Sequence, residues 1–156
     1  MGRVEKAIEI KASPEKVWEM LAFDRQAEWD EQMQKGVKSL EYTSEVNKPE
    51  DKFRVGASAH VDIKGMGAGE FDFEVTESLE NEKMTFNVKK SGANRPSVIA
   101  TFLLEPIKAG TKLAIVYNYE MPWGVFGKGL NKLFGQRMEE KHQEKCLEQL
   151  KSILEK

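Results

Sequence analysis

His142 is the side chain in this chain best placed by type and position to do chemistry. The residues that precede and follow it at four-residue spacing are apolar, so it interrupts an otherwise apolar series. An imidazole there could hydrogen-bond a ligand carbonyl or act as a general acid or base near neutral pH. A histidine satisfied by its neighbours at the margin of a helix is the more common arrangement. His142 is therefore a candidate catalytic residue and nothing firmer.

The other reactive side chains do not form a recognisable site. His60 shares the polar side of a predicted strand with Asp62, which indicates a solvated position. Two histidines and the single Cys146 are not grouped on one element, so no metal site and no cofactor is predicted. No spacing suggests a nucleophile with its base. Catalysis stays an open alternative without direct support.

The apolar series around His142 predicts a long C-terminal helix over residues 123–156. Side chains four residues apart lie near one another on a helix, although each step of four drifts by about 40°. A straight helix cannot hold the whole series on one face, and we expect a break in its glycine-containing first part, residues 123–135. That part is either a lid or a place of close approach to a sheet. The series consists of Phe126, Leu130, Phe134, Met138, His142, Cys146, Leu150 and Leu154.

Most of the remaining chain alternates between apolar and polar residues, which predicts strands. Ser13, Pro14 and Glu15 follow the first strand with a capping hydroxyl, a first-turn proline and an acid, and so begin a short helix. Asp24 can cap a second short helix that ends at Trp29. The predicted strands are 4–10, 36–46, 53–63, 71–75, 84–88, 98–104 and 113–119.

Length and composition describe one domain, residues 1–156. Charged residues make up 32% and the net charge is −2, which excludes the basic footprint of a nucleic-acid-binding protein. A lone cysteine allows no intrachain disulfide, and no segment has the ~18 apolar residues of a membrane span. We expect a cytoplasmic protein without a signal peptide. A monomer is expected, with a dimer as the alternative.

Several stretches make the whole chain resemble the START-like, or helix-grip, superfamily (SRPBCC), in its polyketide cyclase/dehydrase and lipid-transport branch. They are IEIKASPEKVW at 8–18, Trp29, Glu105-Pro106 with GTKL at 110–113, PWG at 122–124, and LKSIL at 150–154. The resemblance implies an α+β fold, in which a curved seven-stranded antiparallel sheet wraps around the long C-terminal helix. Two short helices after the first strand would close one end of an elongated apolar cavity.

The resemblance also implies that inward-facing residues line a ligand cavity. Small residues at 57 and 59, opposite several phenylalanines, suggest room between sheet and helix. An ordinary packed core explains each of these residues singly. Tyr117 and Tyr119 combine an apolar ring with a hydroxyl and are the expected polar anchors. The expected lining is Trp29, Val55, Ala57, Ala59, Phe71, Phe73, Phe86, Phe102, Tyr117, Tyr119, Phe126, Leu130, Phe134, Met138 and His142.

Three functions remain in competition. The leading one is binding, and by extension transport, of a small hydrophobic molecule such as a lipid, polyketide or quinone. Apolar residues near the cavity entrance would make at most transient contact with a membrane. The second is a polyketide cyclase or dehydratase that uses His142 or a tyrosine. The third is a protein-binding or stress-response module, whose partner would dock on Ile99, Leu103 and Val116. The fold alone does not choose among them.

Overall fold

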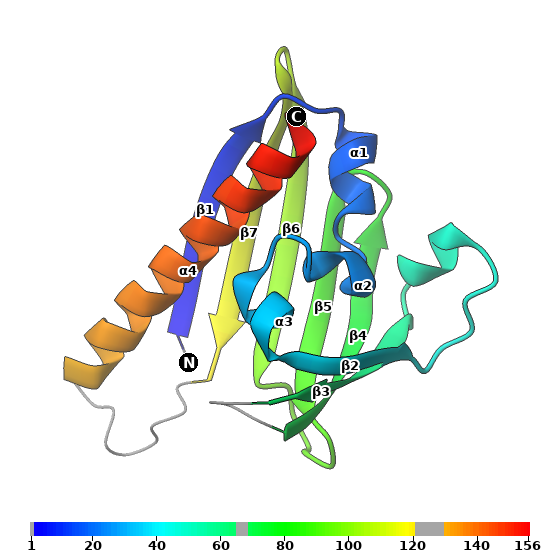
Figure 1. Ribbon diagram of the computed structural model, residues 1–156, viewed down its shortest axis with the longest axis vertical. Coiled ribbons are helices and arrows are strands. Elements are labelled where there is room, and N and C mark those ends of the chain that lie inside the picture. Colours follow the sequence, from blue (N-terminus) through cyan, green and yellow to red (C-terminus); the bar gives the residue numbers. More distant parts are fainter. Residues whose placement is uncertain (1, 65–68, 121–129) are drawn as a thin grey trace.

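The computed structural model describes residues 2–64, 69–120 and 130–156, except for the side chains at 32 and 130–135. Figure 1 shows how its helices and strands are arranged. In chain order they are β1 (Gly2–Ile10), α1 (Pro14–Glu19), α2 (Phe23–Gln26), α3 (Glu31–Gly36), β2 (Val37–Tyr42), the 3-10 helix η1 (Pro49–Lys52), β3 (Ser58–Ile63), β4 (Gly69–Leu79), β5 (Lys83–Lys90), β6 (Val98–Ile107), β7 (Gly110–Tyr119) and α4 (Leu130–Leu154).

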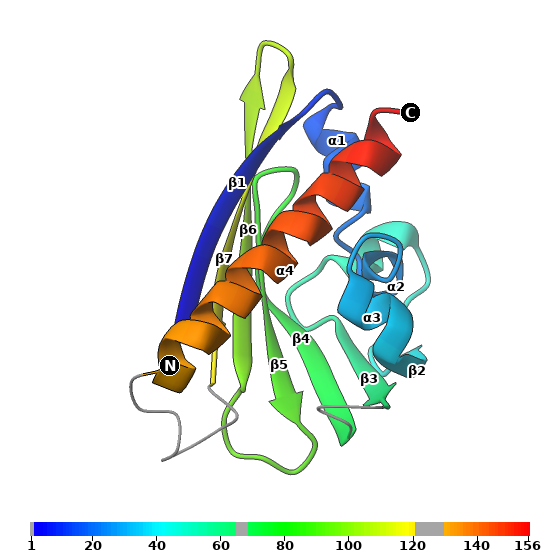
Figure 2. The ribbon, with the colours of Figure 1, turned by 60° about the vertical axis from the view of Figure 1, so that its left-hand side comes forward.

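The seven strands form one antiparallel sheet in the order β1-β7-β6-β5-β4-β3-β2. The first strand pairs with the last, and from β7 to β2 each strand pairs with the one before it in the sequence. The sheet is curved, and α4 crosses its concave side diagonally while α1, α2 and α3 cover the part nearer β2 (Figures 1 and 2). The predicted α+β helix-grip class is confirmed.

Three short helices, not two, follow β1. The first begins as predicted: Ser13 caps it by accepting a hydrogen bond from the Lys16 backbone nitrogen at 3.4 Å, and Pro14 occupies its first turn. The unpredicted one is α3. Asp30 caps α3, because its carboxylate accepts from the Met33 backbone nitrogen at 3.3 Å. This cap fixes Asp30 beside the concave side of the sheet.

The strand predicted over residues 53–63 begins only at Ser58. The preceding residues form η1 and a turn in which Gly56 has a φ of 93°, a conformation that ends strand geometry. Val55 precedes that glycine and its side chain is 63% exposed. Its placement on an inward-facing strand, and with it in the cavity lining, is wrong.

Aromatic side chains fill the concave side beneath α2. The Phe23 ring lies 5.4 Å from that of Phe73 and 5.3 Å from that of Phe86, and Phe86 lies 5.8 Å from Phe102. Trp29 packs edge-on against Phe102 at 5.9 Å. All five are at most 5% exposed. We call these five residues the aromatic cluster; it makes this end of the molecule a packed core.

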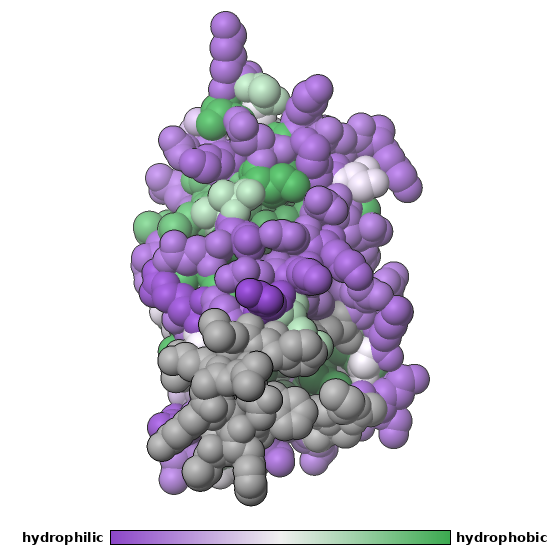
Figure 3. All heavy atoms as spheres, turned by 90° about the vertical axis from the view of Figure 1, so that its left-hand side faces the viewer, coloured by the Kyte–Doolittle hydropathy of each residue, from purple (hydrophilic) through white to green (hydrophobic). Residues whose placement is uncertain are grey.

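Helix α4 is continuous from Leu130 to Leu154 and passes through Gly135 without interruption, whereas residues 123–129 of the segment in which we expected a break lie outside the described residues. Cys146, Leu147 and Leu150 are buried against the sheet, whereas Met138 is 55% exposed. Two steps of four residues rotate Met138 about 80° away from Cys146, so it leaves the buried face. Its predicted place in the lining is wrong. Where Figure 3 shows described residues on the side formed by β1 and α4, hydrophilic residues surround a smaller hydrophobic patch.

Within residues 2–64, 69–120 and 130–156, no helix is long and apolar enough to cross a bilayer.

Candidate functional site

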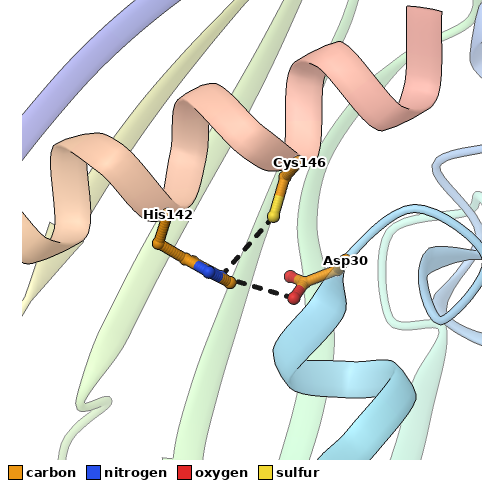
Figure 4. Close-up of side chains that lie close together, drawn as sticks. All are labelled: Asp30, His142 and Cys146. Carbon is orange, nitrogen blue, oxygen red and sulfur yellow. Dashed lines mark hydrogen bonds and ion pairs between the residues drawn. The ribbon is translucent and has the colours of Figure 1, made fainter. Parts of the chain in front are cut away.

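The candidate site lies where α4 passes the start of α3. Helix α4 contributes Glu139, His142 and Cys146, which are three and four residues apart and therefore share a face. Asp30 reaches them from the link between α2 and α3, and Figure 4 shows its carboxylate directed at His142. Tyr117 of β7 lies close enough for the charges of Asp30, Glu139 and Cys146 to act on its hydroxyl.

His142 has two close polar neighbours, and both meet the same ring nitrogen. The distance from its Nε2 atom to Asp30 Oδ1 is 3.4 Å, and that to Cys146 Sγ is 3.5 Å. Burial disfavours the imidazolium, but Asp30 and then Cys146 outweigh it and raise the pKa of His142 to about 10. Asp30 therefore favours the protonated, positively charged form of the His142 side chain.

Glu139 is the acid that the sequence analysis missed. Burial raises the pKa of its carboxyl group above the ordinary value, and the charge of Asp30 adds to this, while His142 and a hydrogen bond from Gln143 act in the opposite direction. The Oε2 atom is buried and has no hydrogen-bond partner within the described part of the chain. The signal in the sequence was its position seven residues before Cys146, which places an acid on the same face of α4 as that apolar residue.

The two predicted anchor tyrosines lie side by side on β7, with ring centroids 5.8 Å apart. Tyr119 donates from its hydroxyl to Gln136 Oε1 at 3.2 Å, which ties the end of β7 to α4. Burial, followed by the nearby carboxyl groups of Glu139 and Asp30, raises the pKa of the Tyr117 hydroxyl above its usual value. Both tyrosines are therefore neutral hydrogen-bonding groups over the physiological range.

A pocket of about 520 Å³ opens at the end of the sheet where β4 begins and β5 and β7 end. Phe71 and Lys90 are register partners on its sheet side, and Arg95 forms an ion pair with Glu120 at 2.8 Å across its rim. Its volume is typical of small-molecule sites, which span roughly 300–1,000 Å³. The lining residues are Phe71, Lys90, Ala93, Asn94, Arg95, Ser97 and Glu120.

The predicted lining residues separate into groups. Trp29, Phe73, Phe86 and Phe102 belong to the aromatic cluster, and Ala57 and Ala59 are buried in the same core. Phe71 lines the pocket, Tyr117 packs against the core, and Tyr119 is buried with its hydroxyl bonded to Gln136 of α4. The predictions for Phe126 and for the side chains of Leu130 and Phe134 fall outside the described residues, as do residues 123–129 of the lid predicted over 123–135.

His60 occupies the outward side of β3, where the sequence placed it. Its Nδ1 atom lies 2.9 Å from Asp72 Oδ1, and its Nε2 atom lies 3.2 Å from Glu70 Oε1. The two carboxylates therefore approach opposite ring nitrogens, as partners of a protonated imidazole do.

We expect Asp72→Asn to lower the pKa of His60. The hydrogen bond to Asp72, and then that to Glu70, raise this pKa above 6.5. A raised folded-state pKa means that the pair stabilises the protein below pH 6.5 and loses that effect as pH rises through the folded pKa. An NMR titration of the His60 ring protons measures the shift. Asp62→Asn on the same strand is the control, and an equal change there would contradict the assignment.

Comparison with known proteins places this geometry in context. The chain matches the family described as polyketide cyclase/dehydrase and lipid transport over residues 1–155. No curated protein matches it. Solved structures share the fold: protein CV1439 from Chromobacterium violaceum has 18% identity and a TM-score of 0.68, with 100% of this chain and 99% of that chain covered.

Two further structures agree with that match. A protein of unknown function from Staphylococcus aureus, SA2116, has 13% identity and a TM-score of 0.70, covering 98% of this chain and 93% of its own. TTHA0849 from Thermus thermophilus has 22% identity and a TM-score of 0.65, covering 97% of this chain and 94% of its own. Identities this low support the fold alone. Because the family match spans residues 1–155, the chain belongs to the polyketide cyclase/dehydrase and lipid transport family.

Proposed function

We propose that the protein binds a small, mostly apolar molecule at the open end of the concave side of the sheet. The observation that carries the proposal is the pocket of about 520 Å³ at that end, with Phe71 on its sheet side. Within the described residues the aromatic cluster packs the part of the concave side beneath α2, so the pocket end offers more room for a ligand. The family's description, which names polyketides and lipids, supports the same class of ligand.

Polar groups beyond the pocket would select a ligand with one hydrogen-bonding end. Tyr117 and Tyr119 continue along β7 from the pocket residue Glu120. Glu139 has a buried carboxyl oxygen without a partner in the described residues, and its raised pKa favours the protonated form, which can both donate and accept. A ligand with an apolar body and one hydroxyl or carbonyl group would suit both the pocket and these polar side chains.

A glutamate at the pocket should weaken binding of an apolar probe. We expect Phe71→Glu to raise the Kd of the neutral dye N-phenyl-1-naphthylamine by about tenfold or more, since a buried phenylalanine contributes about 1.5–3 kcal/mol. Phe71 is only partly buried, and Lys90 beside it can pair with the new carboxylate, so the fold should persist. Fluorescence titration measures the affinity.

Leu79→Glu is the matched control, because Leu79 is 53% exposed at the other end of the same strand. Its Kd should equal that of the wild type. Equal affinities for all three proteins would place the dye elsewhere and reject the pocket. Failure of the wild type to bind the dye, together with no apolar molecule extracted from the purified protein, would reject the binding function.

A cyclase or dehydratase activity is the second candidate. It is favoured by the grouping of Glu139, His142 and Tyr117, three groups able to donate or accept protons, at the inner side of the proposed ligand space. The protein-binding alternative has less support. Of its three expected contact residues, Leu103 is 40% exposed, but Thr101 separates it from Ile99 and is hydrogen-bonded to Thr85 at 3.0 Å.

A further inference from the structure

We infer that Asp30, His142 and Cys146 form a binding site for zinc or a chemically similar transition-metal dication. One donor atom from each of the three residues lies within 4.8 Å of the others, and Figure 4 shows the three side chains converging between α4 and the start of α3. This proposal replaces the expectation that the chain has no metal site. That expectation compared only the histidines and the cysteine, and it missed the carboxylate.

Two of the three donor separations match those expected around a tetrahedral ion. With Zn–N, Zn–O and Zn–S bonds of about 2.0–2.3 Å, tetrahedral angles place nitrogen about 3.4 Å from oxygen and about 3.6 Å from sulfur. The observed distances are 3.4 Å from His142 Nε2 to Asp30 Oδ1 and 3.5 Å from Nε2 to Cys146 Sγ. Small side-chain movements would therefore suffice to admit the ion.

The same geometry argues against a proton relay. A cysteine–histidine–carboxylate relay uses opposite ring nitrogens, one for the thiol and one for the acid. Here both partners meet Nε2, which carries at most one proton and cannot point it at both. At His60, by contrast, the two carboxylates approach opposite nitrogens. A metal ion in place of that single proton would interact with all three donors at once.

The donors are held in place by regular structure. His142 and Cys146 are four residues apart on α4, and the Asp30 carboxylate is fixed by capping α3. Cys146 is 1% exposed, so its sulfur would be shielded from bulk water once it is bound to the ion. A thiolate with an imidazole selects zinc-like ions over Mg²⁺ and Ca²⁺, which prefer oxygen donors. Three protein donors leave a fourth position for water or an oxygen atom of a bound molecule.

Cobalt(II) provides a test whose readout does not depend on activity. We expect one equivalent of Co²⁺ to bind the full-length, chelator-treated, reduced protein and to give a thiolate-to-cobalt charge-transfer band, with Zn²⁺ displacing it. X-ray absorption of the zinc form should show one sulfur at about 2.3 Å and lighter donors at about 2.0–2.2 Å. Cys146→Ser should lose the band. Asp30→Asn, which keeps a capping oxygen, and His142→Gln should weaken affinity by at least about tenfold.

His60→Gln is the matched control and should bind Co²⁺ like the wild type. Circular dichroism of every variant checks folding, and Cys146→Ala serves if the serine variant does not fold. Absence of the charge-transfer band in the wild type would overturn the proposal. So would a Co²⁺ affinity that survives in Cys146→Ser and His142→Gln but is lost in His60→Gln, because the ion would then bind at the exposed carboxylates beside His60.

Discussion

Replacing Gly110 with alanine is expected to lower the free energy of unfolding by about 3 kcal/mol or more. A Cβ atom there would lie 2.2 Å from the Ile10 carbonyl oxygen and 2.7 Å from the Ala12 nitrogen, and the φ of Gly110 is +153°. The neighbouring backbone cannot easily yield, because Ile10 pairs with Thr111, whose hydroxyl donates to the Ala12 carbonyl at 2.7 Å. Urea unfolding measures the loss.

Gly92→Ala separates the cost of a steric clash at the new Cβ from the cost of a positive φ. Gly92 also has a positive φ, +85°, but no atom of the described residues lies within 4 Å of the position of its Cβ. We expect it to cost only about 1 kcal/mol. Equal losses in the two variants would mean that positive φ alone matters and that β1 does not hold the β6–β7 turn as closely as the structure indicates.

The architecture could be predicted because its signals are local. Alternating residues in β1, the capping serine at 13 and the long apolar series of α4 each depend on neighbours within a few residues. Where the same reasoning failed, a local feature imitated the pattern. Val55 continues the alternation of β3 in sequence, yet Gly56 turns the chain before the strand begins. Met138 fits a four-residue spacing that a helix with 3.6 residues per turn does not keep on one face.

The candidate site was less predictable because it depends on a tertiary contact. His142 was noticed from the interruption of an apolar series, but its partner Asp30 comes from a short helix cap far away in the sequence. No periodicity connects α3 to α4. Apart from its spacing from Cys146, nothing in the sequence distinguishes Glu139 from the other acids of α4, because acids on long helices are usually solvated, and only the packed structure shows its oxygen buried. Sequence patterns predict where helices and strands lie, whereas a contact between polar side chains of two elements can be identified only once the fold is known.

Phe102→Ala should separate stability from ligand binding. Phe102 is 1% exposed and contacts the rings of Trp29 and Phe86, so its truncation is expected to cost about 3–5 kcal/mol of unfolding free energy. It is absent from the pocket lining, so the affinity for N-phenyl-1-naphthylamine should stay near that of the wild type. Phe71→Glu should show the opposite combination, with weaker binding and a smaller loss of stability.

Leu103→Ala is the control for truncation on the same strand. Its side chain points to the other side of the sheet and is 40% exposed, so we expect a loss of less than about 1 kcal/mol. If Phe102→Ala also abolished dye binding while remaining folded, the ligand space would extend into the aromatic cluster. The division into a packed end beneath α2 and a binding end near Phe71 would then be wrong, and the ligand would have to displace aromatic side chains as it enters.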